Sequence, residues 1–251
     1  MKGSFLIVLV VGLCTGARAQ APVDVFREAN GHYQEGRYPD AKAAYESILA
    51  NGSESAALYL NLGNTCFRMG DVASAILNYE RGLRLAPDDE DLLFNLDLVS
   101  LSTVDRIVPA PRLFIWDYWD GIKSAFSLPG VFWSAFTVWV MTFVFLSLLM
   151  FAASFTIRRL ALFGSVGMGV LFILLLTVGV SRVADLSRTD QAVIMSSIIS
   201  VKNAPDTRST DAFVLHAGAR VQITDNVGDW VQIRLADGKV GWVEGEVVEV
   251  I

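Results

Sequence analysis

Residues 131–155 read VFWSAFTVWVMTFVFLSLLMFAASF, and residues 160–181 read LALFGSVGMGVLFILLLTVGVS. Each segment exceeds the roughly 20 residues that an α-helix needs to cross about 30 Å of hydrocarbon. Only Arg158, Arg159 and their immediate neighbours separate the two segments. The sequence therefore predicts two transmembrane helices, residues 131–155 and 160–181, joined by a short basic turn. Because Lys and Arg near membrane ends favour the cytoplasmic side, we predict that this turn faces the cytoplasm and both flanking regions lie outside.

The two apolar segments contain no Asp, Glu, Lys, Arg or His. A transporter or a proton relay normally needs such groups along its path, so we interpret the hairpin as an anchor in the lipid bilayer. Gly164, Ser165, Gly167 and Gly169 give the second segment a surface of small side chains. Such a surface favours close helix contact, either within the hairpin or with another membrane protein.

The N-terminus has the pattern of a signal peptide at residues 1–19. Lys2 supplies a positive start, residues 5–13 form an apolar core, and Ala17-Arg18-Ala19 is a small-x-small cleavage pattern. Cys14 raises lipidation as an alternative, but it follows Leu13, where a lipoprotein signal has a small residue. With the basic turn, the signal predicts a two-pass protein of the bacterial cytoplasmic (inner) membrane, with periplasmic N- and C-terminal domains.

Composition excludes several classes of function. The 251 residues carry a net charge of -6, and no Lys- or Arg-rich run exists, so we expect no nucleic-acid partner. Cleavage of the signal would leave Cys66 as the one cysteine, which excludes an intramolecular disulfide and a cysteine-based metal cluster. His32 and His216 fall in different regions. We therefore expect no metal, no cofactor and no catalytic residues, and predict that the protein is not an enzyme.

The region before the hairpin contains an internal repeat of 34 residues. The recurring pairs are Gly36 and Gly70, Ala41 and Ala75, and Tyr45 and Tyr79. Glycine suits the end of the first helix of each unit, small residues allow the paired helices to approach, and tyrosine fills the gap to the next helix. The pattern resembles the tetratricopeptide (TPR) family over residues 22–89. A further apolar helix after Pro87 is predicted to cap the array, so the domain spans 22–102.

The TPR resemblance implies a concave groove that binds a peptide or a partner protein. The residues expected to face this groove are Arg27, Asn30, Asn61, Asn64, Arg68, Phe94 and Asn95. Asn30 and Asn61 match asparagines that hold the peptide backbone in TPR domains that bind a partner's C-terminal carboxylate. Phe26, Asp91 and Asn95 stand where that clamp has basic residues, so the match is incomplete. The alternative interpretation is that Asn30 and Asn61 are merely solvated. Cys66 is expected to pack in the core.

Residues 103–130 form a linker that contains Pro109, Pro111 and Pro129. Within it, Ile115, Trp119, Ile122 and Phe126 fall on one helical stripe. Aromatic residues favour the headgroup layer of a membrane, so we predict an interfacial helix. Packing of this helix against the repeat domain is the alternative.

Residues 188–251 have the pattern of a small β module. The predicted strands are residues 192–199, 220–224, 230–235 and 239–243, with turns at Gly228-Asp229 and Asp237-Gly238. Gly228-Asp229-Trp230 and Gly241-Trp242-Val243 resemble the bacterial SH3 family, which implies binding of cell-wall peptide or protein. Trp230 and Trp242 are the candidate ligand-binding residues, with core packing as the alternative for each. We expect a structural role for His216.

The predicted fold class is a multidomain membrane protein: an α-helical TPR solenoid, a two-helix transmembrane hairpin and a small all-β SH3-like barrel. This order of modules resembles the BatE family of the bacterial aerotolerance operon. The resemblance implies a non-enzymatic scaffold for other membrane or periplasmic proteins, including Bat proteins with von Willebrand A domains and, indirectly, a MoxR-type ATPase. The alternative is an envelope anchor whose SH3-like domain binds peptidoglycan.

Overall fold

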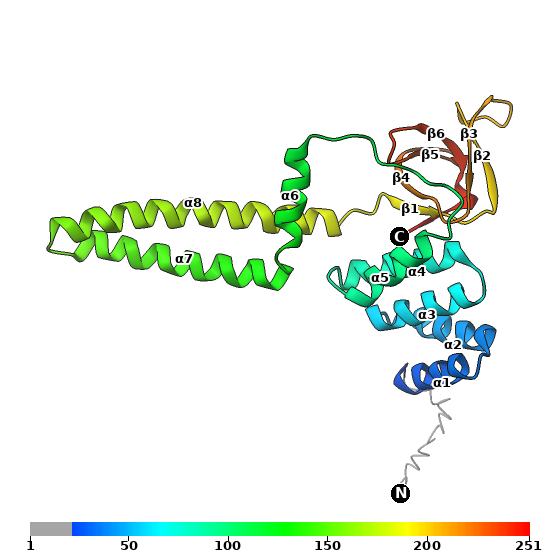
Figure 1. Ribbon diagram of the computed structural model, residues 1–251, viewed down its shortest axis with the longest axis horizontal. Coiled ribbons are helices and arrows are strands. Elements are labelled where there is room, and N and C mark those ends of the chain that lie inside the picture. The colour runs from blue at the N-terminus through cyan, green and yellow to red at the C-terminus, as the bar shows by residue number, and fades with distance from the viewer. Residues whose placement is uncertain (1–21) are drawn as a thin grey trace, which may run out of the picture. The chain divides into compact units, whose positions relative to one another are not determined.

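The computed structural model describes residues 22–251, and the predicted signal peptide and Cys14 lie outside these residues. The chain divides into two compact units at Glu54/Ser55, and each is described here by itself. The colours of Figure 1 follow the chain from the repeat helices to the C-terminal sheet.

The first unit contains a pair of packed helices, α1 (Pro22–Gln34) and α2 (Tyr38–Ala50). Gly36 lies between them with φ of 75°, in the left-handed region that favours glycine, as the repeat predicts. Ala29 and Ala41 are fully buried where the helices approach. The Tyr45 hydroxyl, on the next turn of α2, donates a hydrogen bond to Oδ1 of Asn30 at 2.6 Å.

The second unit begins with the helices α3 (Ala56–Arg68), α4 (Val72–Leu85) and α5 (Glu90–Ser100). Each begins after a side chain that accepts a backbone N–H of its first turn: Ser55, Asp71 and Asp89. Gly63 of α3 lies directly against the ring of Tyr79, and a Cβ there would be 2.5 Å from Cε1. α5 is the helix predicted after Pro87, and it packs on α4 through Leu92.

Three helices follow: α6 (Phe114–Ser124), α7 (Leu128–Phe151) and α8 (Phe155–Leu186). α7 begins three residues before the predicted span and ends four before its predicted end. α8 is longer than the predicted 160–181 at both ends, because residues 155–159 and 182–186 continue the helix although they are polar in part. Hydropathy predicted only the apolar part of this helix.

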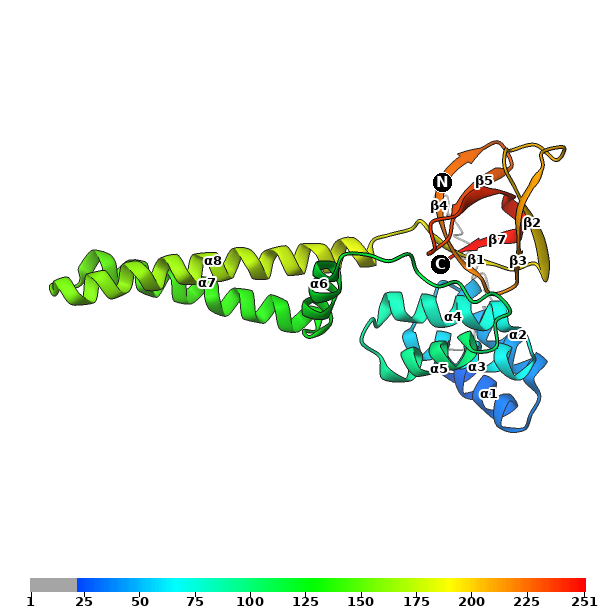
Figure 2. The ribbon, with the colours of Figure 1, turned by 45° about the horizontal axis from the view of Figure 1, so that its top comes forward.

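The prediction of a basic turn was wrong in its detail. Residues 152–154 make the connection, and Arg158 and Arg159 lie within α8. Arg158 Nε donates to the backbone oxygen of Ala152 at 2.7 Å, which gives a carbonyl at the end of α7 a partner. The two helices run antiparallel side by side in both ribbon views (Figures 1 and 2).

The chain ends in a seven-stranded antiparallel sheet. Its strands are β1 (Gln191–Ile194), β2 (Ile198–Lys202), β3 (Asp211–His216), β4 (Arg220–Val227), β5 (Trp230–Arg234), β6 (Val240–Glu244) and β7 (Val248–Val250). The order across the sheet is β3-β2-β6-β5-β4-β1-β7. Inward residues from these strands, including Ile194, Val201 and Ile233, form one buried core.

Two strand predictions need correction. The predicted strand 192–199 is two strands, since β1 pairs with β4 and β7 while β2 pairs with β3 and β6. β3 and β7 had not been predicted. The turn prediction at Gly228-Asp229 is confirmed: these two residues connect β4 to β5, and Val227 pairs directly with Trp230.

Candidate binding sites

In the first unit, the two predicted groove residues lie on α1. Arg27 is largely exposed and pairs with Asp24, with 3.0 Å between Nη1 and Oδ1. Asn30 is half-buried and accepts the hydroxyl of Tyr45. The contact from Tyr45 fixes the orientation of this amide, so Asn30 has a structural role whether or not it also contacts a ligand.

In the second unit, α3 carries Asn61, Asn64 and Arg68 at intervals of three and four residues, which places them on one helix face. Asn64 accepts the Tyr79 hydroxyl at 2.7 Å. Arg68 is exposed at the C-terminal end of the helix. On α5, Asn95 donates its amide to the backbone oxygen of Asp91 at 2.7 Å, within its own helix.

The two asparagine–tyrosine contacts were missed by the sequence interpretation. Asn30 and Tyr45 stand 34 residues before Asn64 and Tyr79, so the same hydrogen bond occurs in both repeats. The signal was present, because asparagine recurs at the repeat spacing just as tyrosine does. Cys66 is fully buried, which confirms the prediction of core packing.

On the barrel, Trp230 and Trp242 lie on the same outer face. Gly241 and Val243 are buried, so strand alternation turns Trp242 to the opposite side, where it pairs across strands with Gln232. Trp242 is therefore half-buried rather than enclosed in the core. Trp230, also half-buried, lines a cavity of about 230 Å³ together with Lys202, Thr207 and Glu244. Both tryptophans are thus placed where a ligand could reach them.

One face of α4 packs on the barrel. A Cβ on Gly218, in the turn after β3, would lie 3.1 Å from Cδ1 of Ile76, which is itself fully buried. Val193 is also fully buried, although alternation points it away from the barrel core, because α4 covers β1. We call this contact the α4–barrel seam.

Charged residues on α4 hold the edges of the seam. Arg81 donates to Oε1 of Glu249 at 2.9 Å and to the backbone oxygen of Val250 at 2.8 Å. Arg84 donates to the backbone oxygens of Ile251 and Arg188. These arginines therefore satisfy carbonyl groups along the last strand and at the end of α8, in addition to one carboxylate.

The linker after α5 also contacts the barrel. Oδ2 of Asp105 accepts the backbone N–H of His216 at 2.6 Å, and its Oδ1 lies 2.9 Å from Nδ1 of the same residue. Ile107 packs against the barrel core, and the N–H of Ala110 donates to Ala236 at 2.9 Å. The structural role expected for His216 is confirmed, and the first part of the linker is an ordered strap along the barrel.

The predicted aromatic helix exists as α6, whose apolar and aromatic side chains are largely exposed, including Phe114, Trp116 and Tyr118. At its end, Lys123 contacts Asp185 of α8 at 2.6 Å and Asp120 at 2.9 Å. The hydrogen bond with Asp185 raises the pKa of Lys123 above its ordinary value. The hydrogen bond from Lys123 lowers the pKa of Asp120. This ion-pair cluster ties α6 to α8.

Arg182, near the end of α8, is half-buried among several acceptors, with 11% of its side chain exposed. Its guanidinium donates to the backbone oxygens of Lys123 and Phe126 and to the carboxylate of Asp88 at 2.8 Å. Asp88 belongs to the connection between α4 and α5. One arginine therefore links the end of the hairpin both to α6 and to the repeat helices of the same unit.

α7 and α8 are long and apolar enough to cross a membrane, at 24 and 32 residues. Only 6% and 17% of their most apolar windows are buried within the protein, unlike core helices of a soluble domain. Gly164 packs against the ring of Phe145, whereas a Cβ on Gly167 or Gly169 would meet nothing within 4 Å. The small-residue surface thus serves packing within the hairpin at Gly164 and stays open at the other two glycines.

Comparison with known families agrees with this arrangement. Residues 26–90 match the tetratricopeptide repeat model, and residues 199–249 match the model of the bacterial SH3 domain. The chain carries TPR repeats and a bacterial SH3 domain. Both family predictions are confirmed for these residues, whereas comparison with curated proteins found no match. Among residues 22–251, no group of three or more His, Cys, Asp or Glu side chains is arranged to hold a metal ion.

Proposed function

We propose that this protein is a non-enzymatic adaptor anchored in the membrane, which holds partner proteins through its TPR helices and its SH3 domain. The α4–barrel seam carries the proposal. Because α4 belongs to the TPR repeats and is tied to the barrel by Arg81 and Arg84, the repeat helices α3 to α5 and the SH3 domain act as one body. A partner engaged by one module is thereby held close to the other.

The proposed anchor is the hairpin of α7 and α8. Its exposed apolar surface is suited to lipid, and the exposed aromatic side chains of α6 are suited to the headgroup layer. We place both soluble modules in the periplasm, on the basis of the N-terminal signal pattern and of Arg158 and Arg159 at the far end of the hairpin. Lys123 and Arg182 are cations at the opposite end of the hairpin and would favour the reverse orientation. The orientation therefore needs a direct test.

The order of modules supports a place for this adaptor among Bat proteins. In that setting its partners would include proteins with von Willebrand A domains, and a MoxR-type ATPase would act on the assembly from the cytoplasm. The aerotolerance role rests on the resemblance of module order alone. The adaptor function itself does not require an aerotolerance role.

A second candidate function is an envelope anchor whose SH3 domain binds peptidoglycan. The cavity beside Trp230 favours it, because a half-buried indole next to Lys202 and Glu244 offers both an apolar face and charged partners. Binding of the purified protein to cell-wall sacculi tests this function. We expect wild type to bind and Trp230→Ala to lose most binding; an absence of binding by wild type would rule the anchor out.

Crosslinking in native membranes tests the adaptor. A photo-reactive residue replaces Arg68, which is exposed on α3, and a matched control replaces Arg208, which is exposed on the barrel. We expect position 68 to capture specific membrane or periplasmic proteins that position 208 does not. Recovery of the chain alone from position 68 would count against the adaptor.

Cysteine labelling tests the orientation separately. Ser209→Cys lies in an exposed loop of the barrel, and Ser154→Cys lies in the connection between α7 and α8. With Cys66 replaced by Ala, a membrane-impermeant maleimide applied to spheroplasts should label position 209 and leave position 154 unlabelled. The reverse pattern would place both modules in the cytoplasm.

A further inference from the structure

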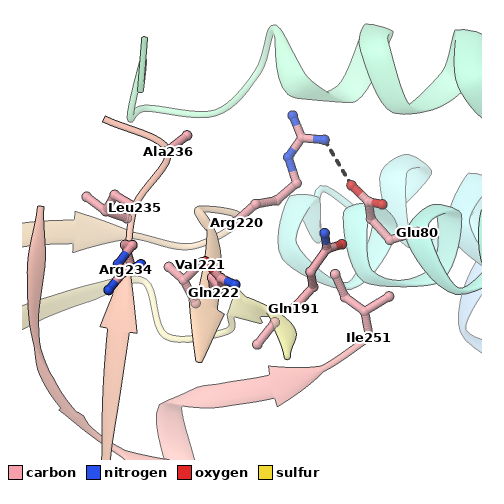
Figure 3. Close-up of a pocket in the computed structure, with 10 residues that line it drawn as sticks. Glu80, Gln191, Arg220, Val221, Gln222, Arg234, Leu235, Ala236 and Ile251 are labelled. Atoms are coloured by element: carbon pink, nitrogen blue, oxygen red, sulfur yellow. Dashed lines mark hydrogen bonds and ion pairs between the residues drawn. The ribbon is translucent and has the colours of Figure 1, made fainter. Parts of the chain in front are cut away.

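A polar cavity of about 400 Å³ lies between the barrel and Glu80 of α4 (Figure 3). Glu80 of α4 lies on one side and the strands β1, β4 and β5 line the other. The apolar part of its wall includes Leu235 and Ile251. The cavity is separate from the one beside Trp230 and from the predicted groove residues of the TPR helices.

Three polar side chains of this cavity come from one row across the sheet. Gln191 of β1 pairs with Gln222 of β4, and Gln222 pairs with Arg234 of β5. Residues paired directly across antiparallel strands point to the same face, so the two amides and the guanidinium share the outer surface of the barrel. Arg220 lies two residues before Gln222 and adds a second guanidinium to the same face.

The two arginines differ in their partners. Arg220 is held by Glu80, with 2.9 Å between Nη1 and Oε1. Among the residues that the structure describes, the guanidinium of Arg234 has no hydrogen-bond or ion-pair partner, although Arg234 lines the cavity. Gln222 donates to Oδ2 of Asp190 at 2.6 Å, which orients its amide. The lining side chains Glu80, Arg220 and Arg234 carry one negative and two positive charges, and the carboxylate of Asp190 next to Gln222 adds a second negative charge.

We propose that this cavity binds the free C-terminal carboxylate of a peptide, with Arg234 as its main partner. A guanidinium matches a carboxylate with two parallel hydrogen bonds. The amides of Gln191 and Gln222 both donate and accept, as pairing with a peptide backbone requires. The carboxylates of Glu80 and Asp190 disfavour a phosphate, which would bring nearly two negative charges into the cavity, more than they disfavour a ligand with one carboxylate.

This site deepens the proposed function, since it names a ligand class for the SH3 domain, and it rests on that function for the supply of peptide or protein partners. The test uses the full chain in detergent. The probes are a fluorescein-labelled tetra-alanine with a free carboxylate and the same peptide as its C-terminal amide, compared by fluorescence anisotropy. We expect the carboxylate form to bind at least tenfold more tightly than the amide.

Single substitutions test whether the peptide binds in this cavity. Arg234→Gln should abolish the preference for the carboxylate form, and Arg234→Lys should keep part of it. Glu80→Gln should strengthen binding of the carboxylate form severalfold, because it removes a negative charge from the cavity. Arg208→Gln is the matched control, an exposed barrel arginine outside the cavity.

Three results would overturn the proposal: equal binding of the two peptides, an unchanged preference in Arg234→Gln, or displacement of the peptide by inorganic phosphate at lower concentration than by acetate. None of these would affect the crosslinks expected from position 68. Failure of this site and failure of the adaptor function are therefore distinguishable.

Discussion

Oε1 of Glu80, on α4, lies 2.9 Å from Nη1 of Arg220, on β4, across 140 residues of sequence. Only about a sixth of the Glu80 side chain is exposed, whereas about half of Arg220 is. The pair closes one side of the polar cavity and joins a TPR helix to the SH3 barrel. A half-exposed pair of this kind contributes little to stability by itself, so the packing beside it must supply most of the attachment.

The packing at Gly218 tests the seam. Gly218→Ala forces a side chain into φ of 88° and brings its Cβ to 3.1 Å from Ile76 and 3.2 Å from Thr103. Gly238→Ala, at φ of 92°, meets nothing within 4 Å and so isolates the backbone strain. We expect strain of about 1–3 kcal/mol in both variants and a further loss of about 1–3 kcal/mol from overpacking in Gly218→Ala. Thermal unfolding measures the difference.

Hydrogen exchange along α4 provides a second measurement for the same pair. Exchange of residues 72–85 should accelerate in Gly218→Ala and stay near wild type in Gly238→Ala. Equal exchange in the two variants would show that α4 does not depend on its contact with the barrel.

Gly63 lies so close to the ring of Tyr79 that a larger residue at position 63 should disturb the packing of α3 on α4. Gly63→Ala places a Cβ 2.5 Å from a ring that is fully buried. We expect a net loss of about 1–2 kcal/mol, because overpacking exceeds the gain in helix propensity. Gly31→Ala, in α1 with open space around the new Cβ, should instead gain up to about 1 kcal/mol. Circular dichroism on heating compares them; a stabilised Gly63→Ala would contradict the observed packing.

The ion pairs of Lys123 predict how the attachment of α6 to α8, called the tie below, depends on pH. The pKa of Asp120 is lowered in the fold, so its contribution is present above the ordinary value of about 4 and is lost as pH falls below that value. The pKa of Lys123 is raised, so its contribution is present below about 10.5 and is lost as pH rises beyond it. We therefore expect the tie to be strongest between about pH 4 and 10.5.

Chymotrypsin cleavage at the aromatic residues of α6 measures that tie near neutral pH. Lys123→Met should speed cleavage severalfold, because Asp120 and Asp185 lose their shared partner. Lys239→Met, which removes an ion pair with Asp237 on the barrel, is the control. Equal cleavage of the two variants would show that the cluster does not hold α6.

Two glycines of α8 should differ in how far a larger side chain disturbs the pairing of α7 with α8. Gly164→Leu would drive a side chain into Phe145, whereas Gly167→Leu has open space. A disulfide between Val131→Cys and Gly179→Cys, which lie in contact across the hairpin, reports the pairing of the helices once Cys14 and Cys66 are replaced. We expect crosslinking to slow severalfold in Gly164→Leu and to remain at the starting rate in Gly167→Leu. Equal rates would contradict the intrachain role of Gly164.

Local patterns in the sequence predicted most of the elements. Hydropathy located both long helices, the 34-residue spacing located the repeat helices with their glycine turns at Gly36 and Gly70, and the turn at Gly228-Asp229 located the β4–β5 hairpin. Each of these depends on residues close together in the chain. The errors fell where neighbours in space override local composition, as at the ends of α8 and in the division of the predicted strand 192–199 into β1 and β2.

For the candidate sites too, the sequence predicted some features and only the tertiary structure decided others. The sequence singled out Asn64, Arg68, Trp230 and Trp242, but the hydrogen bond from Tyr79 to Asn64 and the outward placement of Trp242 required coordinates. Composition and periodicity were enough for the order of modules, because core residues repeat at the period of the element that they stabilise, whereas the two families were recognised by the resemblance of their motifs. Tertiary structure alone decided that α4 packs on the barrel and that Gln191, Gln222 and Arg234 share a cavity. Arg81 and Glu249 are 168 residues apart. From the sequence alone, a charged residue on a helix surface that faces water cannot be distinguished from one that faces another domain.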